Sequence, residues 1–452
     1  MKKNLSQAPV RRKLSSFQTI TLGFAAIILL GALLLMLPIS SKSGQVTPFS
    51  KTLFTATSAT CVTGLVVLDT GSYWSMFGQF IILVLIQIGG LGVITIAVAL
   101  AMLSGKKISL MQRSTLQDSI AAFNVGGIVR LTRFIFKGTF IIELIGALCM
   151  MPTFISDYGI KGIWLACFHS ISAFCNAGFD IFGTINNKFI SLVNYVSNPI
   201  INVVIISLII IGGIGFLTWE DICKHKLDFK KYRLQTKLIL ITTLILIVVP
   251  AVFFFYIDFN DLSGSNRILA SLFQSVTLRT AGFNTVDLTK MSEASKMLMI
   301  MLMLIGGCPG STAGGMKTTT IAIIFLNTVS TFLRKEDTEA FDRRIENTIV
   351  KNACTVATFY IFIFFFGGIA ISVIENLPII DCMFETASAV GTVGLSLGLT
   401  PSLSSASHII LIILMYLGRV GGLTLIYAAF KTRGSIDGRY PLEKVTVGEE
   451  LL

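Results

Sequence analysis

Four short segments of this sequence share one pattern, a glycine that follows small or neutral residues and precedes leucine or phenylalanine. The four segments are SATCVTGL, SAFCNAGF, VTLRTAGF and SAVGTVGL, which end at Leu65, Phe179, Phe283 and Leu395. Glycine adopts backbone angles closed to other residues and places no side chain in a crowded ring. No ring of carboxylates occupies these positions, which argues against a divalent cation. The available chemistry is therefore that of main-chain carbonyl oxygens, which can replace water around a bare monovalent cation.

We take the glycine of each segment and the residues just before it as the candidate ion filter. These residues are Val62, Thr63, Gly64, Asn176, Ala177, Gly178, Thr280, Ala281, Gly282, Thr392, Val393 and Gly394. Six residues before each glycine stand Ser58, Ser172, Val276 and Ser388. The stretch after each segment repeats as well, with Gly89, Gly212, Gly306 and Gly418 each six residues ahead of a threonine. Four copies of one unit, each unable to bury its polar loop alone, predict assembly around a shared axis.

The composition places these segments in a lipid bilayer. The 452 residues are 53% hydrophobic and only 13% charged, with a mean hydropathy of +0.80, whereas soluble domains average about 25% charged residues. The net charge of +12 does not indicate nucleic-acid binding, because the positive residues lie between apolar stretches. The eight cysteines are scattered without a CxxC pair, so we interpret them as packing residues.

Eight apolar stretches are long enough to cross the membrane, which takes about 20 residues. They are 17–38, 75–104, 134–155, 197–219, 236–257, 293–330, 348–373 and 405–430. Most of the 36 lysines and arginines lie at the N-terminus, in three connections and in the C-terminal tail. The positive-inside rule therefore predicts that both termini are cytoplasmic. On the outer side, each pair of spans is joined by a moderately apolar stretch too short to cross, which predicts a re-entrant helix.

The predicted fold is an all-α integral membrane protein with four pseudo-symmetric helix, pore helix, helix repeats around one ion pore. Repeat 1 and the N-terminus cover residues 1–115, repeat 2 covers 116–233, repeat 3 covers 234–345 with a gating loop at 306–320, and repeat 4 with the tail covers 346–452. Non-helical backbone at membrane depth exists only where it is buried in protein or lines a watery cavity. Each pore helix would direct its partially negative C-terminal carbonyls at that cavity, a field that favours a cation.

The motifs VTGL, RTAGFNT, GTVGLS and GGCPGSTAGGMKT resemble those of the Ktr/Trk/HKT superfamily of potassium transporters. The similarity covers about residues 15 to 445 and is greatest to the ion-conducting membrane subunit of bacterial Ktr systems. It implies K⁺ uptake across the plasma membrane through a channel-like pore in which one glycine per repeat lines the filter. All four positions are glycine here, and the serine of the Na⁺-selective plant members is absent. The resemblance implies no enzyme activity and no organic cofactor, and it leaves dependence on Na⁺ open.

The same resemblance implies partners. It predicts a homodimer in the lipid bilayer, a cytosolic ring of nucleotide-binding regulatory subunits, and no nucleic acid. The basic connections 224–237 and 334–351 and the tail after Lys431 are candidate docking surfaces for that ring. They could equally be topological charges that face lipid headgroups.

The sixth predicted span is interrupted by a stretch that cannot hold a regular helix, because its glycines loosen the backbone and its proline removes a donor. The resemblance implies that it is an intramembrane gate, and the alternative is an immobile packing kink. The predicted gate residues are Gly306, Gly307, Pro309, Gly310, Ser311, Thr312, Gly314, Gly315, Lys317 and Arg419. A phosphate-binding loop does not fit, because Met316 stands where that pattern needs glycine before the lysine.

Several polar residues lie within apolar stretches, where they are costly and usually face the protein interior. Arg419 is predicted near the gate, either to repel cations or to anchor the loop, with a purely structural clamp as the alternative. Arg279 is predicted to brace the filter from behind rather than to contact the ion. Glu143 is either a proton-coupling carboxylate or a bonded structural glutamate. Glu385 could add negative potential near a pore helix, and His169 is predicted to pack.

Two other classes of function compete with a channel-like pore. An alternating-access cation symporter typically has two inverted repeats, whereas the four repeats here share one orientation. A membrane enzyme would bring histidines, carboxylates or cysteines together, yet the three histidines are far apart in the sequence and no metal-ligand spacing occurs.

Overall fold

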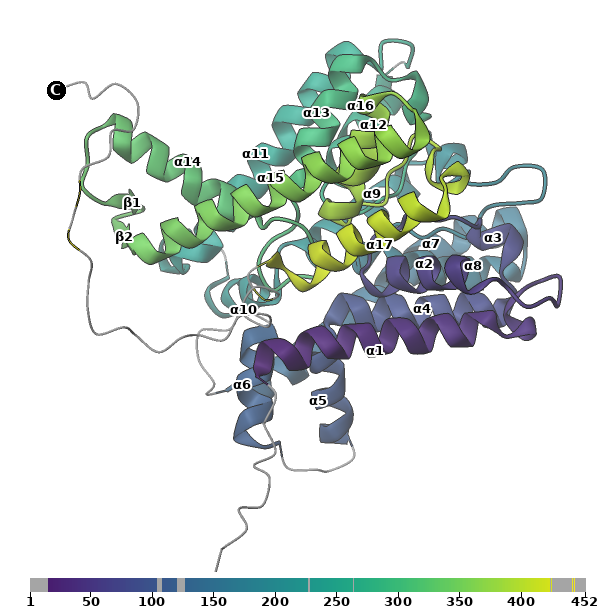
Figure 1. Cartoon of the computed structure of the whole chain (residues 1–452), viewed down its shortest axis with the longest axis horizontal. Helices are drawn as coiled ribbons and strands as arrows, with labels where there is room; N and C mark the ends of the chain where they lie inside the picture. The colour runs from purple at the N-terminus through teal and green to yellow at the C-terminus, as the bar shows by residue number, and fades with distance from the viewer. Residues whose placement is uncertain are drawn as a thin grey trace, which may run out of the picture.

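The chain folds into a helical bundle, shown in Figure 1 as a computed structural model. The structure describes residues 15–103, 108–119, 127–226, 228–262 and 264–422, with positions 424, 441 and 443. Within these residues the fold is helical, as predicted, except for two short antiparallel strands, Thr338–Ala340 (β1) and Arg343–Ile345 (β2). The strands form a hairpin that the sequence analysis did not predict.

Four helices are long and apolar enough to cross a membrane as single spans. They are α1 (Ser16–Met36), α7 (Ile128–Tyr158), α11 (Leu234–Ile257) and α15 (Asn347–Glu375). Each presents large apolar side chains outward; on α7 the exposed row includes Phe140, Leu144 and Leu148. An exposed apolar surface of this extent suits contact with lipid rather than water. The protein is therefore a multi-pass membrane protein.

A short helix follows each of these four and is too short to cross the bilayer. The short helices are α2 (Phe49–Thr60), α8 (Lys161–Phe174), α12 (Gly264–Thr277) and α16 (Ile379–Gly391). Phe54, Phe168 and Phe384, the large residues ten positions before the repeated glycines, are fully buried. The four short helices match the predicted re-entrant helices, and Figure 1 shows them toward one end of the bundle.

The helices that complete the first three repeats are broken, whereas the sequence predicted a break only in the sixth span, 293–330. In the first repeat, α4 (Met76–Leu91) and α5 (Val93–Leu103) meet at a bend of 96°. In the second repeat, α9 (Pro199–Gly213) and α10 (Phe216–His225) meet at a bend of 97°. The third repeat divides into α13 (Glu293–Leu304) and α14 (Thr318–Phe332), and the fourth contains α17 (Ser405–Val420). Counting each bent pair as one span, six stretches of the described residues are long and apolar enough to cross a membrane. The other two predicted spans, 293–330 and 405–430, contain shorter helices, and residues 425–430 lie outside the described residues.

One glycine position causes these breaks. Gly92 has φ 87° and ψ 135°, Gly215 has φ 93° and ψ 141°, and Gly421 has φ 91° and ψ 134°. These angles lie outside the range of other residues, so each glycine ends its helix and redirects the chain. In the third repeat Pro309 stands at the equivalent position, where a missing N–H also prevents a regular helix.

Smaller elements join the repeats. They are α3 (Thr70–Tyr73), α6 (Leu110–Ser119) and the 3₁₀ turns Pro38–Ser40, Val193–Tyr195, Phe229–Lys231, Leu288–Lys290 and Thr400–Ser402. In Figure 1, α6, α10, α14, β1 and β2 lie at the end opposite to α2 and α8.

The repeats are packed in a circle. Each short helix packs against the long helix of its own repeat and against the helix that ends the previous repeat, giving the pairs α2 with α17, α8 with α4, α12 with α9, and α16 with α13. The pair α17 and α2 joins the last repeat to the first (Figure 1). This closed order places the C-terminal ends of the four short helices around one axis.

Candidate ion pathway

The four predicted filter glycines meet on this axis. A Cβ atom added to Gly64 would lie 2.6 Å from the carbonyl oxygen of Ala177, and one added to Gly178 would lie 2.7 Å from that of Ala281. The same construction at Gly282 gives 2.3 Å to the oxygen of Val393. At Gly394 the distance is 2.2 Å to the oxygen of Thr63, which closes the ring. Each glycine therefore leaves room for a carbonyl of the next repeat.

The filter backbone alternates in handedness. Val62, Asn176, Thr280 and Thr392 have φ between 51° and 63°, and the four glycines have φ between 65° and 96°. The residue between each pair is not among those with positive φ. Non-glycine residues adopt positive φ rarely and at a cost, so the surrounding structure must hold this shape. Alternating φ turns successive carbonyl oxygens of an extended chain toward the same side, which suits an ion on the axis.

The repeated serines hold three of the filter segments. The hydroxyls of Ser58 and Ser388 accept hydrogen bonds from the backbone N–H of Gly64 and Gly394, at 3.1 and 2.9 Å. Ser172 instead donates to the carbonyl of Phe179 at 2.8 Å. These contacts explain why serine recurs six residues before the filter glycine.

The third repeat has Val276 at this position and uses its neighbour instead. The Thr277 hydroxyl donates to the carbonyl oxygen of Phe283 at 2.5 Å. Asn176 and the Thr280 hydroxyl lie 3.3 Å apart and connect the second and third filter segments. The sequence analysis missed Thr277, because the repeat alignment points to the valine one residue earlier.

A cavity of about 360 Å³ lies above the filter and is lined by all four filter glycines. Asp69, Asp180 and Asp287 line it too, and among the described residues its lining includes no lysine or arginine. Burial, reinforced by the neighbouring Asp69, raises the pKa of Asp180 to about 7. The hydroxyl of Thr289 donates to Asp287 and lowers the pKa of that carboxyl. The sequence analysis missed these carboxylates: Asp69 and Asp287 follow their glycines by five residues but Asp180 by two, so no single spacing marks all three.

Two carboxylates, Asp69 and Glu385, fix the loops around this cavity. Asp69 accepts hydrogen bonds from the backbone N–H of Ser72 and of Phe189, both at 2.7 Å. Glu385, fully buried in α16, accepts from the Ser396 hydroxyl at 2.7 Å and from the Leu397 N–H at 3.0 Å. Both groups therefore hold the chain segments that follow the filter.

The predicted gating loop, 306–320, is an irregular loop between α13 and α14 that ends at residue 317, because α14 begins at Thr318. Its backbone bonds to the break between α9 and α10: the N–H of Cys308 donates to the Gly213 carbonyl at 3.1 Å, and the N–H of Phe216 donates to the Gly310 carbonyl at 2.8 Å. On the opposite side, the N–H of Gly315 donates to the carbonyl of Gly418 at 3.1 Å. The loop thus bridges the broken helices of the second and fourth repeats.

The loop also touches the base of the filter. The Thr312 hydroxyl donates to the carbonyl of Phe174, at the C-terminal end of α8, at 3.1 Å. A Cβ on Gly314 would lie 2.3 Å from the hydroxyl of Thr392. Glycine at position 314 is therefore required for the loop to lie this close to the fourth filter segment.

Arg419 and Lys317 bind this loop through its carbonyls. The Arg419 guanidinium donates to the carbonyls of Thr312 and Gly89, and to that of Gly90 at 3.0 Å. Lys317 donates to the carbonyl of Ala313 at 2.9 Å. Of the two predicted roles for Arg419, these contacts fit the anchor better than a cation that merely faces the pore.

The remaining singled-out residues lie behind the filter. Arg279 is 6% exposed, and its guanidinium lies 3.7 Å from the sulfur of Cys308, a contact that fits the predicted brace. Glu143 accepts a hydrogen bond from Gln87 at 3.2 Å. His169 is fully buried, bonds the Leu165 carbonyl and stacks on Phe182.

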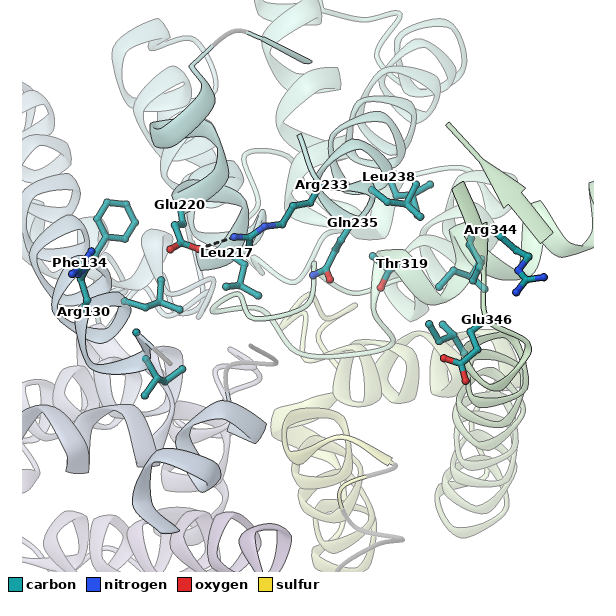
Figure 2. Close-up of a pocket in the computed structure, with 17 residues that line it drawn as sticks. Arg130, Phe134, Leu217, Glu220, Arg233, Gln235, Leu238, Thr319, Arg344 and Glu346 are labelled. Atoms are coloured by element: carbon teal, nitrogen blue, oxygen red, sulfur yellow. Dashed lines mark ion pairs between the residues drawn. The ribbon is translucent and has the colours of Figure 1, made fainter. Parts of the chain in front are cut away.

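A larger cavity, of about 1240 Å³, lies at the opposite end of the bundle from α2 and α8. Figure 2 shows that side chains of α7, α10, α11, α14, β2 and α15 line it. Its charged residues are Arg130, Glu220, Arg233, Arg344 and Glu346, and Glu220 pairs with Arg233 at 3.6 Å. Thr319 lines the same cavity one residue after the start of α14, so the cavity reaches close to the loop.

Comparison with known proteins gives consistent matches. Residues 5–435 match the family model TrkH, described as a cation transport protein. The chain is 39% identical over 97% of its length to the potassium/sodium uptake protein NtpJ of Enterococcus hirae, covering 98% of that protein. It is 40% identical over 95% of its length to the Ktr system potassium uptake protein B of Bacillus subtilis, covering 96% of that protein. The crystal structure of the potassium transporter TrkH from Vibrio parahaemolyticus has the same fold, with a TM-score of 0.73 at 18% identity, over 94% of this chain and 87% of that one.

Proposed function

Because this chain belongs to the TrkH family of cation transport proteins and is a potassium or cation uptake transporter of the Ktr/Trk type, we propose that its four glycine segments are a K⁺ filter. K⁺ moves through it in a channel-like manner, into the cell, across the plasma membrane. The family is one of transporters, so the protein is not an enzyme. The transported K⁺ is its ligand, and it needs no organic cofactor.

The observation that carries this proposal is the closed ring of glycines at the C-terminal ends of four short helices. Each helix end directs partial negative charge at the ring, and each segment offers main-chain oxygens. The carboxylates of the outer cavity raise the local concentration of cations before they enter. A cation can therefore exchange its hydration shell for protein oxygens at this ring.

The loop 306–317 is the gate in this proposal. It lies against the filter base, and Arg419 fixes it there by hydrogen bonds to its carbonyl at Thr312 and to α4. Ion passage requires the loop to leave this position, and the hydrogen bonds to Gly213 and Gly418 must then break. Gly306, Gly307, Gly310, Gly314 and Gly315 supply backbone freedom for that movement, and Pro309 and Ser311 lie among them where the chain is not helical.

Regulation comes from another chain in this proposal. A relative is named as part of a Ktr system, and we extend to this chain a homodimer bound by a cytosolic ring of nucleotide-binding subunits. Two of the three predicted docking connections, 224–237 and 334–351, line the large cavity of Figure 2. A subunit bound there lies beside α14, which begins at the end of the gate loop. The third, the tail after Lys431, lies outside the described residues apart from single positions.

An alternating-access symporter remains the competing function, since its helices are also broken at membrane depth. The name of the Enterococcus relative includes sodium as well as potassium, so Na⁺ is tested as a coupling ion. In liposomes, a channel-like pore passes K⁺ down its gradient without Na⁺ on either side. Strict dependence of K⁺ flux on Na⁺ would favour the symporter.

The filter is tested in cells that lack their own K⁺ uptake systems. We expect the wild-type chain, with a regulatory subunit, to restore growth at low K⁺. Gly64→Ser and Gly394→Ser should lose the preference for K⁺ over Na⁺, because their Cβ atoms would lie 2.6 and 2.2 Å from carbonyl oxygens of the adjacent repeats. Unaltered selectivity in both variants would remove these glycines from the filter.

A further inference from the structure

A buried row of hydrogen-bonded side chains connects α7 to the second filter segment. Glu143 of α7 accepts a hydrogen bond from the side-chain amide of Gln87 in α4 at 3.2 Å. The amide oxygen of Gln87 lies 3.5 Å from the sulfur of Cys175, which donates to it. Cys175 directly follows α8 and precedes Asn176, the first filter residue of this repeat. Three side chains, those of Glu143, Gln87 and Cys175, therefore connect a membrane-spanning helix to the filter backbone.

Glu143 is an unusual residue for this position. Its side chain is 5% exposed, and its second carboxylate oxygen has no hydrogen-bond partner among the described residues. A carboxyl group at membrane depth costs free energy and usually indicates a function. An apolar residue of similar size would pack here without that cost, so packing alone does not explain the glutamate.

Close helix contacts keep this chain of side chains rigid. A Cβ on Gly90 of α4 would lie 2.7 Å from the sulfur of Cys175, and a Cβ on Gly146 of α7 would lie 2.6 Å from the hydroxyl of Ser170. That hydroxyl donates to the backbone carbonyl of Glu143 at 2.6 Å. The C-terminal half of α8 is thus held between α4 and α7. Because these contacts are tight, the helices can shift little when Glu143 is replaced.

The polar chain is specific to one side of the filter. Gln87 stands two residues before the repeated glycine, and the other repeats have Ile210, Leu304 and Tyr416 at that position. The filter segment that it supports continues through Asn176 to Thr280 of the third repeat. Support from Glu143 therefore reaches two adjacent walls of the ring.

We infer that Glu143 is a positioning residue for the ion filter. Through Gln87 and Cys175 it fixes the carbonyl oxygens around Ala177 and Gly178 at the spacing that suits K⁺. Without it this segment relaxes, and the ring accommodates the smaller Na⁺ more readily. The inference rests on the proposed filter function of these glycines and adds a residue outside the filter that determines ion preference.

The test uses the purified full chain in liposomes and measures the ratio of K⁺ to Na⁺ influx. Glu143→Gln keeps an oxygen that accepts from Gln87, so we expect a ratio close to wild type. Glu143→Leu and Gln87→Leu each remove the hydrogen bond, and the ratio should fall roughly 2- to 10-fold, the effect of one lost hydrogen bond. The double variant should equal either single variant, because the two residues act in series.

Gln79→Leu is the matched control. Gln79 lies on the same helix, is 8% exposed, accepts a hydrogen bond from Trp164 at 2.9 Å and donates to the carbonyls of Trp74 and Thr70. These partners do not include Glu143, Gln87 or Cys175. Its replacement also removes a buried hydrogen bond, so it reproduces any general loss of stability. We expect it to leave the K⁺ to Na⁺ ratio unchanged.

Three results separate the explanations. A Glu143→Leu protein with the wild-type ratio and a lower melting temperature would mean that the glutamate only stabilises the fold, and would overturn the inference. Loss of dependence on a proton gradient in Glu143→Gln, with an unchanged ratio, would assign it to proton coupling instead. Gly178→Ser tests the filter separately: if it too leaves the ratio unchanged, the proposed filter fails, whereas a lowered ratio in Gly178→Ser alone refutes only the role of Glu143.

Discussion

At the scale of single residues, charge at the two ends of the pathway follows different rules. The cavity above the four glycines is lined by the carboxylates of Asp69, Asp180 and Asp287, whereas at the loop 306–317 Arg419 and Lys317 lie against backbone carbonyls. Negative charge outside attracts cations over a distance set by salt. Below the filter, the positive charges of Arg419 and Lys317 are stabilised by hydrogen bonds to carbonyl oxygens, and these bonds hold the loop.

Asp180 gives the outer cavity a dependence on external pH. Its pKa is raised to about 7 by burial and by Asp69, so the carboxyl is charged above this pH and neutral below it. We expect K⁺ uptake at subsaturating K⁺ to rise as external pH increases from about 6 to 8, because the ionised form attracts cations. In Asp180→Asn, K⁺ uptake should not change with external pH and should stay at the low rate that the wild type shows below pH 7.

Flux measured at several external pH values in proteoliposomes checks this expectation. Asp287 is the control, since the hydrogen bond from Thr289 lowers its pKa and keeps it charged over this range. Asp287→Asn should lower uptake at every pH without changing the slope. A slope that persists in Asp180→Asn would contradict the assignment.

Arg419 should determine how firmly the gate is held. Arg419→Ala removes every hydrogen bond from this side chain to Thr312, Gly89 and Gly90, so we expect higher basal K⁺ flux and weaker control by a regulatory subunit. Arg419→Lys should be intermediate, because one ammonium cannot replace a guanidinium fork. Fluxes are measured in liposomes per amount of protein. Unchanged flux and unchanged regulation in Arg419→Ala would show that the arginine does not hold a gate.

At the scale of elements, the broken helices give the pathway its inner shape. Gly92, Gly215 and Gly421 impose the same backbone angles in three repeats, while the third repeat replaces the sharp bend with the gate loop. Gly215 lies against the loop, whereas Gly92 does not. Substitutions at these two equivalent positions therefore distinguish an effect of the bend itself from an effect of displacing the loop.

Gly215→Ala and Gly92→Ala test this difference. Both place a side chain at positive φ, a strain of about 1–3 kcal/mol, so both should lower the melting temperature. The new Cβ at position 215 would lie 2.5 Å from the carbonyl oxygen of Pro309, whereas at position 92 the nearest atom would be 3.5 Å away. We expect only Gly215→Ala to change K⁺ flux per amount of protein. Equal fluxes in the two variants would mean that displacing Pro309 does not affect the gate.

The sequence predicted the elements that depend on local pattern. Apolar length indicated the long helices, and the repeated glycines and serines indicated the short helices and their ring, which the structure brings together. The 96° and 97° bends were missed, because apolar content is the same in a straight and a bent span. Thr277 and Asp180 were missed because their roles depend on neighbours from other repeats, which local spacing does not identify.

At the scale of the whole molecule, four unequal repeats share one axis, and each contributes a different structural feature. The second is tied to α7 through Glu143, the third carries the loop 306–317 that we propose as the gate, and the fourth supplies Arg419, which bonds to that loop. The short helices gather at one end, while α10, α14 and the strand hairpin lie at the other (Figure 1). With the positive-inside rule, this polarity predicts that the filter end faces outward and the hairpin faces the cytoplasm.

Labelling of introduced cysteines tests the orientation. The exposed cysteines of the described chain, Cys149, Cys223 and Cys354, are first replaced by alanine. A membrane-impermeant maleimide should label Gln45→Cys in intact cells and Glu336→Cys only in inverted vesicles, since the two exposed positions lie at opposite ends of the bundle. The reverse pattern would place the filter end inside the cell and contradict uptake in the proposed direction.

The contact between Gly394 and Thr63 has a consequence for biosynthesis. The ribosome delivers the first filter segment early and the fourth near the end, an interval on the order of tens of seconds at bacterial elongation rates. Throughout that interval the wall contributed by the last repeat is missing, so the nascent polypeptide has no complete coordination shell to offer an ion. If the four segments form the proposed filter, we therefore expect a chain that ends before residue 394 to conduct no K⁺.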